Sequence, residues 1–210
     1  CIDLKQPEGV RLALELVAKS DVVIEAFTPG VMERLGLGYE ALRAVNPAII
    51  LCSVSGFGQT GPNANRPGYA HVSHAMSGWL ALQFLHREPP EAPRGPGVAI
   101  GDTTAGLTAF GAVCASLFNR ERTGRGDHID ISLFDALFCS NDFTYQAALN
   151  ADAGEIEVWY HPVHATRDGY VTANVGPDMR AWSNVCKAMG RLELLDDPRF
   201  DTQAHVNANA

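Results

Sequence analysis

Two short apolar segments, each preceded by a helical pattern, constrain the fold of this chain most strongly. Residues 22–24 and 48–54 are almost wholly apolar, which is typical of strands buried on both faces of a parallel sheet. An amphipathic helix opened by Pro7 precedes the first segment, and two short helices, at 31–35 and 39–45, precede the second. Because helices and strands alternate at this spacing, the sequence predicts an α/β fold built on a parallel sheet.

The same alternation continues along the chain. A long helix is predicted over 102–122, where apolar residues recur at helical spacing. This segment is also rich in glycine, alanine and serine, so we expect another element to pack closely against it. A strand at 128–132 and a helix at 133–149 follow.

The composition changes after this helix. Residues 151–157 have the character of a linker, and beyond them we predict a strand at 169–175 and a helix at 179–189. We therefore expect two domains: a large α/β domain over 1–150 and an incomplete smaller α/β domain over 155–210.

Composition and charge limit the classes of partner. Hydrophobic residues make up 46% of the chain and charged residues 19%, as in soluble globular proteins. No uncharged apolar run approaches the roughly 18 residues that a membrane-spanning helix requires. The formal net charge of −8 argues against a general nucleic-acid binder. We expect neither a membrane nor a nucleic-acid partner.

The cysteines and the two ends of the chain carry further expectations. The five cysteines are odd in number and widely spaced, and they form no C-x-x-C pair. We expect them to be reduced core thiols of a cytoplasmic protein. The chain begins at Cys1 without a methionine and ends in a polar run over 202–210, so we expect an interior piece of a longer protein.

The segment 101–106, Gly-Asp-Thr-Thr-Ala-Gly, carries the principal chemical candidate. Asp102 lies between glycines at the start of the long helix, at or next to its predicted N-cap. There the positive end of the helix dipole stabilises an ionised carboxylate. One interpretation is that Asp102 only caps the helix. The other is that it is a carboxylate nucleophile that a substrate can approach closely.

A glycine-rich segment invites a dinucleotide-site interpretation that we reject. Residues 56–61 match G-x-G-x-x-G after a strand, but Pro62 and Pro67 exclude the helix whose N-terminus would bind pyrophosphate. We predict instead a mobile glycine-rich loop near a ligand. Ser55 lacks the flanking glycines of a nucleophile elbow.

Two histidine pairs are the only candidates for a metal site. They are His71 with His74 and His161 with His164. Neither pair has a matching cluster of cysteines or carboxylates, so we predict no metal site.

Taken together, an ordered set of short motifs resembles the class III coenzyme A-transferases, the family of formyl-CoA and carnitine CoA-transferases. The resemblance runs through nearly the whole chain; each motif is weak alone, and their order makes the signal specific. The motifs are Leu4-Lys5-Gln6-Pro7-Glu8-Gly9, Glu25-Ala26-Phe27-Thr28-Pro29-Gly30, Arg34-Leu35-Gly36-Leu37-Gly38-Tyr39, Asn46-Pro47, Ser55-Gly56-Phe57-Gly58-Gln59-Thr60-Gly61-Pro62, Arg66-Pro67-Gly68-Tyr69, Gly101-Asp102 and Arg120-Glu121-Arg122-Thr123-Gly124-Arg125-Gly126.

The resemblance implies a Rossmann-like CoA-binding domain and a covalent mechanism. Asp102 matches the family's catalytic aspartate, which would attack an acyl-CoA thioester and form a mixed anhydride with release of CoA thiolate. Coenzyme A would be a co-substrate, with no permanently bound cofactor and no metal. The partners implied are an acyl-CoA, a carboxylic acid acceptor and a second copy of the chain in an interlocked homodimer.

The resemblance also implies where CoA binds. Lys5 and Arg34 would pair with CoA phosphates, although solvated surface charges are the alternative. Phe27 would pack on adenine, although an aromatic residue beside a strand is more often part of a core. The implied CoA contacts are Ile2, Asp3, Leu4, Lys5, Ala26, Phe27, Thr28, Arg34, Gly68 and Tyr69.

Some positions depart from the family pattern and leave alternatives open. Ala26 and Thr28 stand where members often carry other residues, and Ala70 replaces a common acid. An α-methylacyl-CoA racemase of the same fold would place a histidine where this chain has Tyr69. Because tyrosine is a poor base at neutral pH, we favour CoA transfer over racemisation. A non-catalytic CoA-binding homologue is the alternative from another class.

Overall fold

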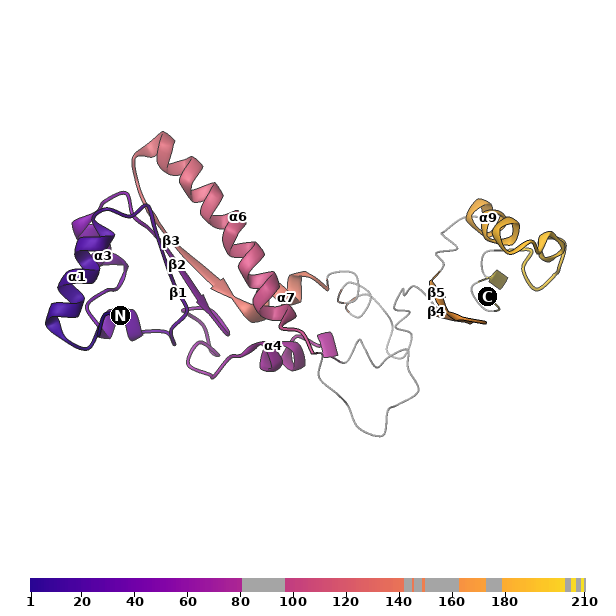
Figure 1. The fold of residues 1–210 in the computed structure, drawn as a ribbon, viewed down its shortest axis with the longest axis horizontal. Helices are drawn as coiled ribbons and strands as arrows, with labels where there is room; N and C mark the ends of the chain where they lie inside the picture. Colours follow the sequence, from indigo (N-terminus) through magenta and orange to yellow (C-terminus); the bar gives the residue numbers. More distant parts are fainter. Residues whose placement is uncertain are drawn as a thin grey trace. The chain divides into compact units, whose positions relative to one another are not determined.

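The structure is a computed structural model of the 210-residue chain. It describes residues 1–80, 97–141, 145, 149, 163–172, 179–202, 205, 206 and 209. The chain separates into two compact units, 1–145 and 146–210 (Figure 1).

A three-stranded parallel sheet forms the centre of the first unit. Its strands are β1 (Val22–Glu25), β2 (Ile50–Ser55) and β3 (Asp127–Ser132), in the spatial order β1-β2-β3. All pairings are parallel, and Cys52 of β2 lies between Ile24 of β1 and Ile129 of β3. The predicted α/β fold with a parallel sheet is therefore confirmed.

The helices of this unit follow the sequence pattern closely, with one exception. The predicted helix 133–149 is interrupted: α7 ends at Cys139, a turn follows at 140–141, and Tyr145 and Leu149 are again helical. The side chains of Ser140 and Asn141 donate hydrogen bonds back to carbonyls of α7, a local competition that disfavours helix continuation. The helices are α1 (Pro7–Val17), α2 (Val31–Arg34), α3 (Tyr39–Val45), α4 (Ala70–Met76), α6 (Ile100–Thr123) and α7 (Leu133–Cys139).

The two faces of the sheet pack against different helices. On one face, Ile50, Cys52 and Ile131 form a buried cluster with Ala105 and Ala109 of α6. On the other face, Leu51 joins a second cluster with residues of α1, α2 and α3. The long α6 lies along its face of the sheet while α1 and α3 lie on the opposite side, which gives a layered α/β arrangement (Figure 1).

The second unit contains a hairpin and a helical cluster. Strands β4 (Val163–Thr166) and β5 (Gly169–Thr172) pair antiparallel, and β4 was not predicted. The helix α9 (Met179–Met189) matches the prediction, and a 3₁₀ helix, Leu192–Leu195, follows it. Trp182 of α9 stacks on Phe200 with ring centroids 5.0 Å apart.

The cysteines depart from the expectation of core thiols. All five are free, but only Cys52 and Cys186 are buried. Cys114 is exposed because it lies on the outer side of α6, away from the sheet. Cys1 and Cys139 are also exposed.

Some predictions fall wholly or partly outside the described residues. They include parts of the predicted helix 133–149, the linker at 151–157, and residues 173–175 of the predicted strand 169–175. Within the part of the chain that the structure describes, no helix combines the length and apolarity needed to cross a bilayer.

Candidate active site

Most of the predicted site residues lie at the carboxyl-terminal edge of the sheet. The chain leaves β1 into Ala26–Gly30 and leaves β2 into the glycine-rich loop. Because α6 runs back along the sheet against the strand direction, its first turn lies at this same edge (Figure 1). Ligands of open parallel sheets bind outside the carboxyl ends of the strands.

Asp102 is the third residue of α6, and its side chain is exposed. The N-cap is Ala99, three residues before Asp102, so the prediction that Asp102 lies at or next to the N-cap is wrong by at least two residues. The helix starts earlier because Ile100 and Gly101 already adopt helical conformation. Among the described residues, the carboxylate of Asp102 has no hydrogen-bond partner. The interpretation that Asp102 only caps the helix therefore finds no support. Its place in the first turn still puts its charge near the positive end of the helix dipole.

The residue before Asp102 packs tightly against α4. The Gly101 N–H donates a 3.0 Å hydrogen bond to Nε2 of His74, which is only 2% exposed. A Cβ on Gly101 would lie 3.6 Å from both the Ala70 Cα and the His74 Nε2. The His74 ring also contacts Trp79, with centroids 5.3 Å apart. The first turn of α6 is therefore held by a neighbouring helix.

The electrostatics of His74 favour its neutral form. Burial lowers the pKa of His74, and the nearby charge of His71 lowers it further, while Asp102 raises it. The burial effect is the largest of the three. A neutral imidazole accepts a hydrogen bond only at the nitrogen that carries no proton, so the contact with Gly101 assigns the proton to Nδ1.

The first group of predicted CoA contacts lies where the chain enters α1. Asp3 Oδ1 accepts the Lys5 N–H at 3.0 Å and shapes a turn there. Gly9 is buried against the carbonyl of Asp3, with no space for a Cβ. Ile2 and Lys5 are exposed, and no described acidic side chain forms an ion pair with Lys5. Leu4 instead packs against the cluster of α1, α2 and α3.

The second group follows β1. Phe27 is 44% exposed, so the interpretation of this ring as part of the core is wrong. Strand β1 ends at Glu25, so the side chain of Phe27 emerges at the edge of the sheet. Ala26, Thr28 and Arg34 are exposed as well, and Nη1 of Arg34 approaches Gly30. This turn and Arg34 thus form one local cluster.

The third group, Gly68 and Tyr69, adjoins both the glycine-rich loop and α4. Gly56 and Gly68 approach so closely that a Cβ on either would overlap the Cα of the other. Tyr69 is the N-cap of α4 and is 67% exposed. Its ring stacks on His71 at 5.9 Å.

The glycine-rich loop itself is irregular chain, and the prediction that no helix starts in it is confirmed. The backbone N–H of Gln59 donates to both carboxylate oxygens of Asp130, at 3.0 and 2.9 Å. The loop is thereby anchored to β3. Its predicted mobility stays a prediction.

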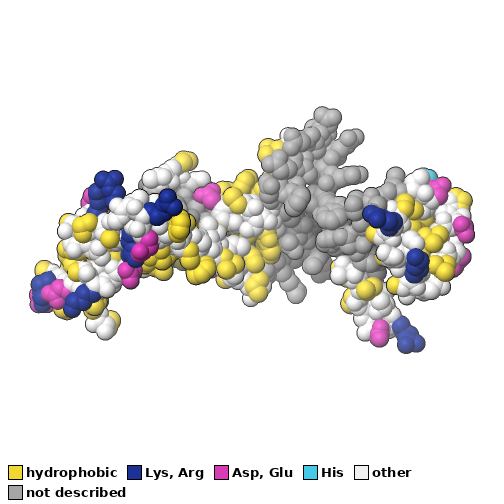
Figure 2. Space-filling view, turned by 90° about the horizontal axis from the view of Figure 1, so that it is seen from above, with side chains coloured by type: hydrophobic (Ala, Val, Ile, Leu, Met, Phe, Trp, Pro, Cys, Tyr) yellow, Lys and Arg dark blue, Asp and Glu magenta, His cyan; other side chains and the backbone are white. Residues whose placement is uncertain are grey.

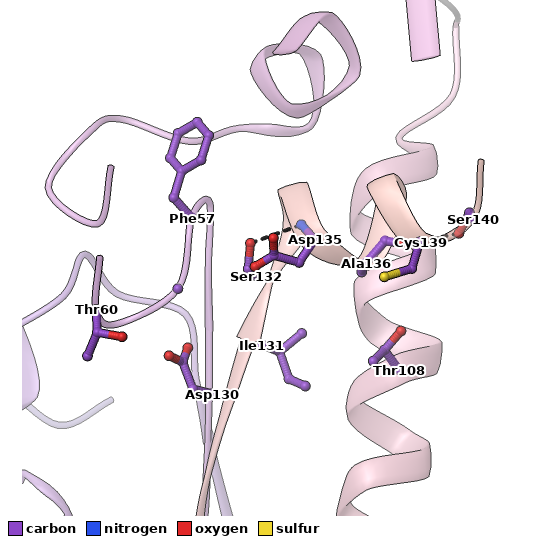
Figure 3. Close-up of a pocket in the computed structure, with 11 residues that line it drawn as sticks. Phe57, Thr60, Thr108, Asp130, Ile131, Ser132, Asp135, Ala136, Cys139 and Ser140 are labelled. Atoms are coloured by element: carbon purple, nitrogen blue, oxygen red, sulfur yellow. Dashed lines mark hydrogen bonds between the residues drawn. The ribbon is translucent and has the colours of Figure 1, made fainter. Parts of the chain in front are cut away.

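A cavity of about 440 Å³ lies beside this loop (Figure 3). Asp130 and Ser132 of β3, Asp135 of α7 and Thr108 of α6 surround it, with Phe57 and Thr60 from the loop. None of the predicted site residues lines this cavity. The cavity and the exposed Asp102 are therefore distinct features of this edge.

Sequence reasoning missed three residues that shape the site. They are Glu25, Asp130 and His74. Glu25 is 8% exposed and accepts the Phe27 N–H at 2.7 Å, so it shapes the turn that carries Phe27. The available signal for Glu25 was an acidic residue at the end of an apolar strand. The partners of Asp130 and His74 are 71 and 27 residues away, so no local pattern indicated them.

No metal site emerges among the described residues, where no group of three or more His, Cys, Asp or Glu could hold an ion. His74 is already bonded to Gly101. His161 lies outside the described residues.

Comparison with known proteins places the chain in a family. The family described as CoA-transferase family III matches residues 1–210. The alpha subunit of succinyl-CoA–L-malate CoA-transferase from Chloroflexus aurantiacus is 49% identical over 210 residues, covering 96% of this chain and 48% of that protein. Succinyl-CoA:glutarate CoA-transferase from Mus musculus is 37% identical over 214 residues, covering 96% of this chain and 47% of that protein. The chain thus spans about half the length of these relatives.

Solved structures agree with this placement. A Mycobacterium tuberculosis protein has the same fold with a TM-score of 0.85 and 30% identity, covering 99% of this chain and 56% of that one. A CAIB/BAIF family protein from Brucella suis gives a TM-score of 0.77 and 34% identity, again covering 99% of this chain and 56% of that one. The sheet, its edge with Asp102 and these similarities lead to one conclusion: the chain belongs to CoA-transferase family III.

Proposed function

We propose that the protein transfers coenzyme A from an acyl-CoA to a carboxylic acid, with Asp102 as the nucleophile. One observation carries the proposal. The Asp102 carboxylate is exposed at the carboxyl edge of the sheet, in the first turn of α6, with no hydrogen-bond partner among the described residues. A carboxylate with free lone pairs and a fixed backbone is suited to nucleophilic attack. Membership of the CoA-transferase family supports this role.

The steps balance without any other reactant. A carboxylate oxygen of Asp102 attacks the thioester carbon, and the C–S bond breaks to release CoA thiolate and leave a mixed anhydride. The thiolate attacks the aspartyl carbon of the anhydride, which frees the donor acid and forms an aspartyl-CoA thioester. The acceptor carboxylate then attacks this thioester, which releases CoA thiolate and leaves a second mixed anhydride. The thiolate attacks the acceptor carbonyl of that anhydride, and the C–O bond to Asp102 breaks to give the new acyl-CoA and the free carboxylate.

CoA would lie along the same edge. Lys5 and Arg34 are exposed cations with no ion pair among the described residues, which suits them to phosphate groups. The half-exposed Phe27 offers a ring face for adenine. Ile2, Asp3, Leu4, Ala26, Thr28, Gly68 and Tyr69 complete the proposed CoA contacts.

The substrates proposed are small dicarboxylic acids and their CoA esters. Relatives carry the names succinyl-CoA–L-malate and succinyl-CoA:glutarate CoA-transferase. Another, from Acetobacter aceti, is an acetyl-CoA:oxalate CoA-transferase and is 37% identical. We propose succinyl-CoA as donor and malate, glutarate or oxalate as the first acceptors to try.

The partner proposed is a second copy of the chain. Leu107, Phe110 and Phe118 of α6 are 68%, 69% and 66% exposed. A Cβ on Gly106 or Gly111 would meet nothing within 4 Å, so the described residues of the first unit do not make the close packing predicted for α6 there. Hydrophobic side chains are visible on the surface of this unit, and charged ones gather near its amino-terminal helices (Figure 2). Light scattering of the full-length protein tests the dimer, and a monomeric wild type would contradict it.

Racemisation is less well supported by the geometry. A two-base mechanism needs a basic group facing Asp102 across the substrate. The Nε2 of His74 is occupied by the Gly101 N–H, and the exposed His71 stacks on Tyr69 instead.

The decisive experiment compares two carboxylates at the same helical position in the full-length protein. Asp102 and Asp135 are each the third residue of a helix. With succinyl-CoA and each acceptor, Asp102→Asn should lower CoA exchange at least about 10³-fold, whereas Asp135→Asn should leave it within about threefold. Hydroxylamine should convert the acylated Asp102 of the wild type to a hydroxamate that peptide mass spectrometry detects. Full exchange by Asp102→Asn would refute the proposal, and CoA binding without any exchange in the wild type would indicate a non-catalytic homologue.

A further inference from the structure

The first turn of α6 depends on a group outside its own helix. The first four N–H groups of any helix have no partner within it, and a side chain at the N-cap often accepts one of them. The N-cap here is Ala99, which carries no acceptor. The Gly101 N–H donates to His74 of α4 instead, at 3.0 Å.

The position of His74 makes this contact rigid. Its side chain is 2% exposed and packs against the ring of Trp79. Gly101 is also buried, and a Cβ there would lie in van der Waals contact with the Nε2 of His74, at 3.6 Å, so the backbone of α6 and the ring are in direct contact. The next residue in the chain is Asp102, so any movement of the Gly101 peptide is passed directly to the carboxylate.

The protonation state of His74 also matters for Asp102. An imidazolium carries protons on both nitrogens, so it could not accept the Gly101 N–H. An imidazolium this close would also compete for the carboxylate as an ion-pair partner. The charged groups that face His74 are Asp102 at the start of α6 and His71 on its own helix. A neutral ring with its proton on Nδ1 keeps the turn fixed and leaves the carboxylate free.

We infer that His74 is a positioning residue for CoA transfer: its unprotonated Nε2 fixes the Gly101 peptide and so orients the Asp102 carboxylate toward the thioester carbon. This inference rests on the proposed function of Asp102. It gives His74 no contact with the substrate and no part in proton transfer to it.

Two substitutions of His74 in the full-length protein separate hydrogen bonding from packing. The amide oxygen of His74→Gln can reach about the same place as Nε2 and accept the Gly101 N–H, whereas His74→Leu fills a similar volume without an acceptor. We expect His74→Gln to keep kcat within about fivefold of the wild type. We expect His74→Leu to lose about 10²-fold in kcat, with the KM for acyl-CoA within about twofold, because misplacement of the nucleophile affects the chemical step more than binding.

The outcomes also distinguish this inference from the proposed function. If Asp102→Asn retains exchange, the nucleophile assignment itself fails. If Asp102→Asn is inactive while His74→Leu, folded by its melting curve, matches His74→Gln in kcat, only the positioning role fails.

A measurement on the wild type covers the case in which His74→Leu does not fold. In protein labelled with ¹⁵N-histidine, the nitrogen shifts of His74 near pH 7.5 should report the Nδ1–H tautomer, with Nε2 unprotonated. A proton on Nε2 would overturn the inference, because that nitrogen could then not accept the Gly101 N–H.

Discussion

The two edges of the three-stranded sheet use their residues differently. At the amino edge, backbone and side chains satisfy one another: the Gly126 N–H donates to the Pro47 carbonyl at 3.1 Å, and the amide of Asn46 donates to the carbonyls of Val17 and Ser20. At the carboxyl edge, Phe27 and Tyr69 stay 44% and 67% exposed.

The residues that stabilise the fold thus lie mainly at one edge of the sheet, and the side chains available to a ligand lie at the other. The amino edge contains short, fully bonded connections, so substitutions there should change the free energy of unfolding. At the carboxyl edge, Phe27 and Tyr69 expose much of their surface, so substitutions of these two residues should change binding and rate more than stability. The predictions below test this division from both sides.

The largest effect on stability is expected at Gly126. A Cβ there would overlap the carbonyl oxygen of Ile49, and because that atom is backbone, β2 and β3 must move apart. We expect Gly126→Ala to lower the free energy of unfolding by roughly 2–4 kcal/mol. Urea unfolding followed by circular dichroism measures it. Gly169→Ala is the control, since a Cβ there meets nothing within 4 Å. Equal stability of the two variants would show that the amino edge is not closely packed.

A smaller loss is expected at Asn46. Its Nδ2 donates to the Val17 and Ser20 carbonyls at 3.3 and 2.9 Å, and its Oδ1 accepts the Ala48 N–H at 3.1 Å. Asn46→Ala leaves these groups unsatisfied and should cost roughly 1–3 kcal/mol, with the activity of the folded fraction unchanged. The exposed Asn119 provides the matched substitution, which should leave stability nearly unchanged. A loss of specific activity in Asn46→Ala would contradict the proposed division.

Phe27 tests the carboxyl edge. We expect Phe27→Ala to raise the KM for acyl-CoA about tenfold, equivalent to about 1.4 kcal/mol, through loss of a ring that packs on adenine. Its free energy of unfolding should change by no more than about 1 kcal/mol, because the ring is only about half-buried. Steady-state kinetics and urea unfolding measure the two effects. Leu16→Ala removes an apolar side chain that is 57% exposed on α1, and it should alter neither KM nor kcat. A KM unchanged by Phe27→Ala would remove the ring from the CoA site.

The sequence predicted the elements of the sheet because their signals are local. The apolar runs that became β1 and β2 and the helical period of α6 each lie within a single segment. The end of α7 was missed, since the apolar period continues past Ser140 while the side chains of Ser140 and Asn141 compete for the last carbonyls.

The candidate site was predictable only in part for the same reason. Asp102 was singled out by its flanking glycines and its place at the start of a helix. His74 was considered only as half of a metal pair with His71, because its true partner, the Gly101 N–H, is on another helix. Contacts between distant segments depend on how α4 packs against α6, and no residue spacing within one segment encodes that arrangement.

The smallest effect expected is a pH dependence at His74, which is buried and hydrogen-bonded at the carboxyl edge. Burial lowers its pKa in the folded protein below the ordinary 6.5. As the pH falls through 6.5, the unfolded chain therefore binds a proton that the folded protein does not. The stability from this group is present above 6.5 and is lost as the pH falls through the folded pKa.

Urea unfolding of the full-length protein between pH 5 and 8 should give a shallower acid-side slope for His74→Gln than for the wild type. His71→Gln, at an exposed histidine on the same helix, should keep the wild-type slope. Identical slopes for all three proteins would contradict the expected effect of burial on the pKa of His74.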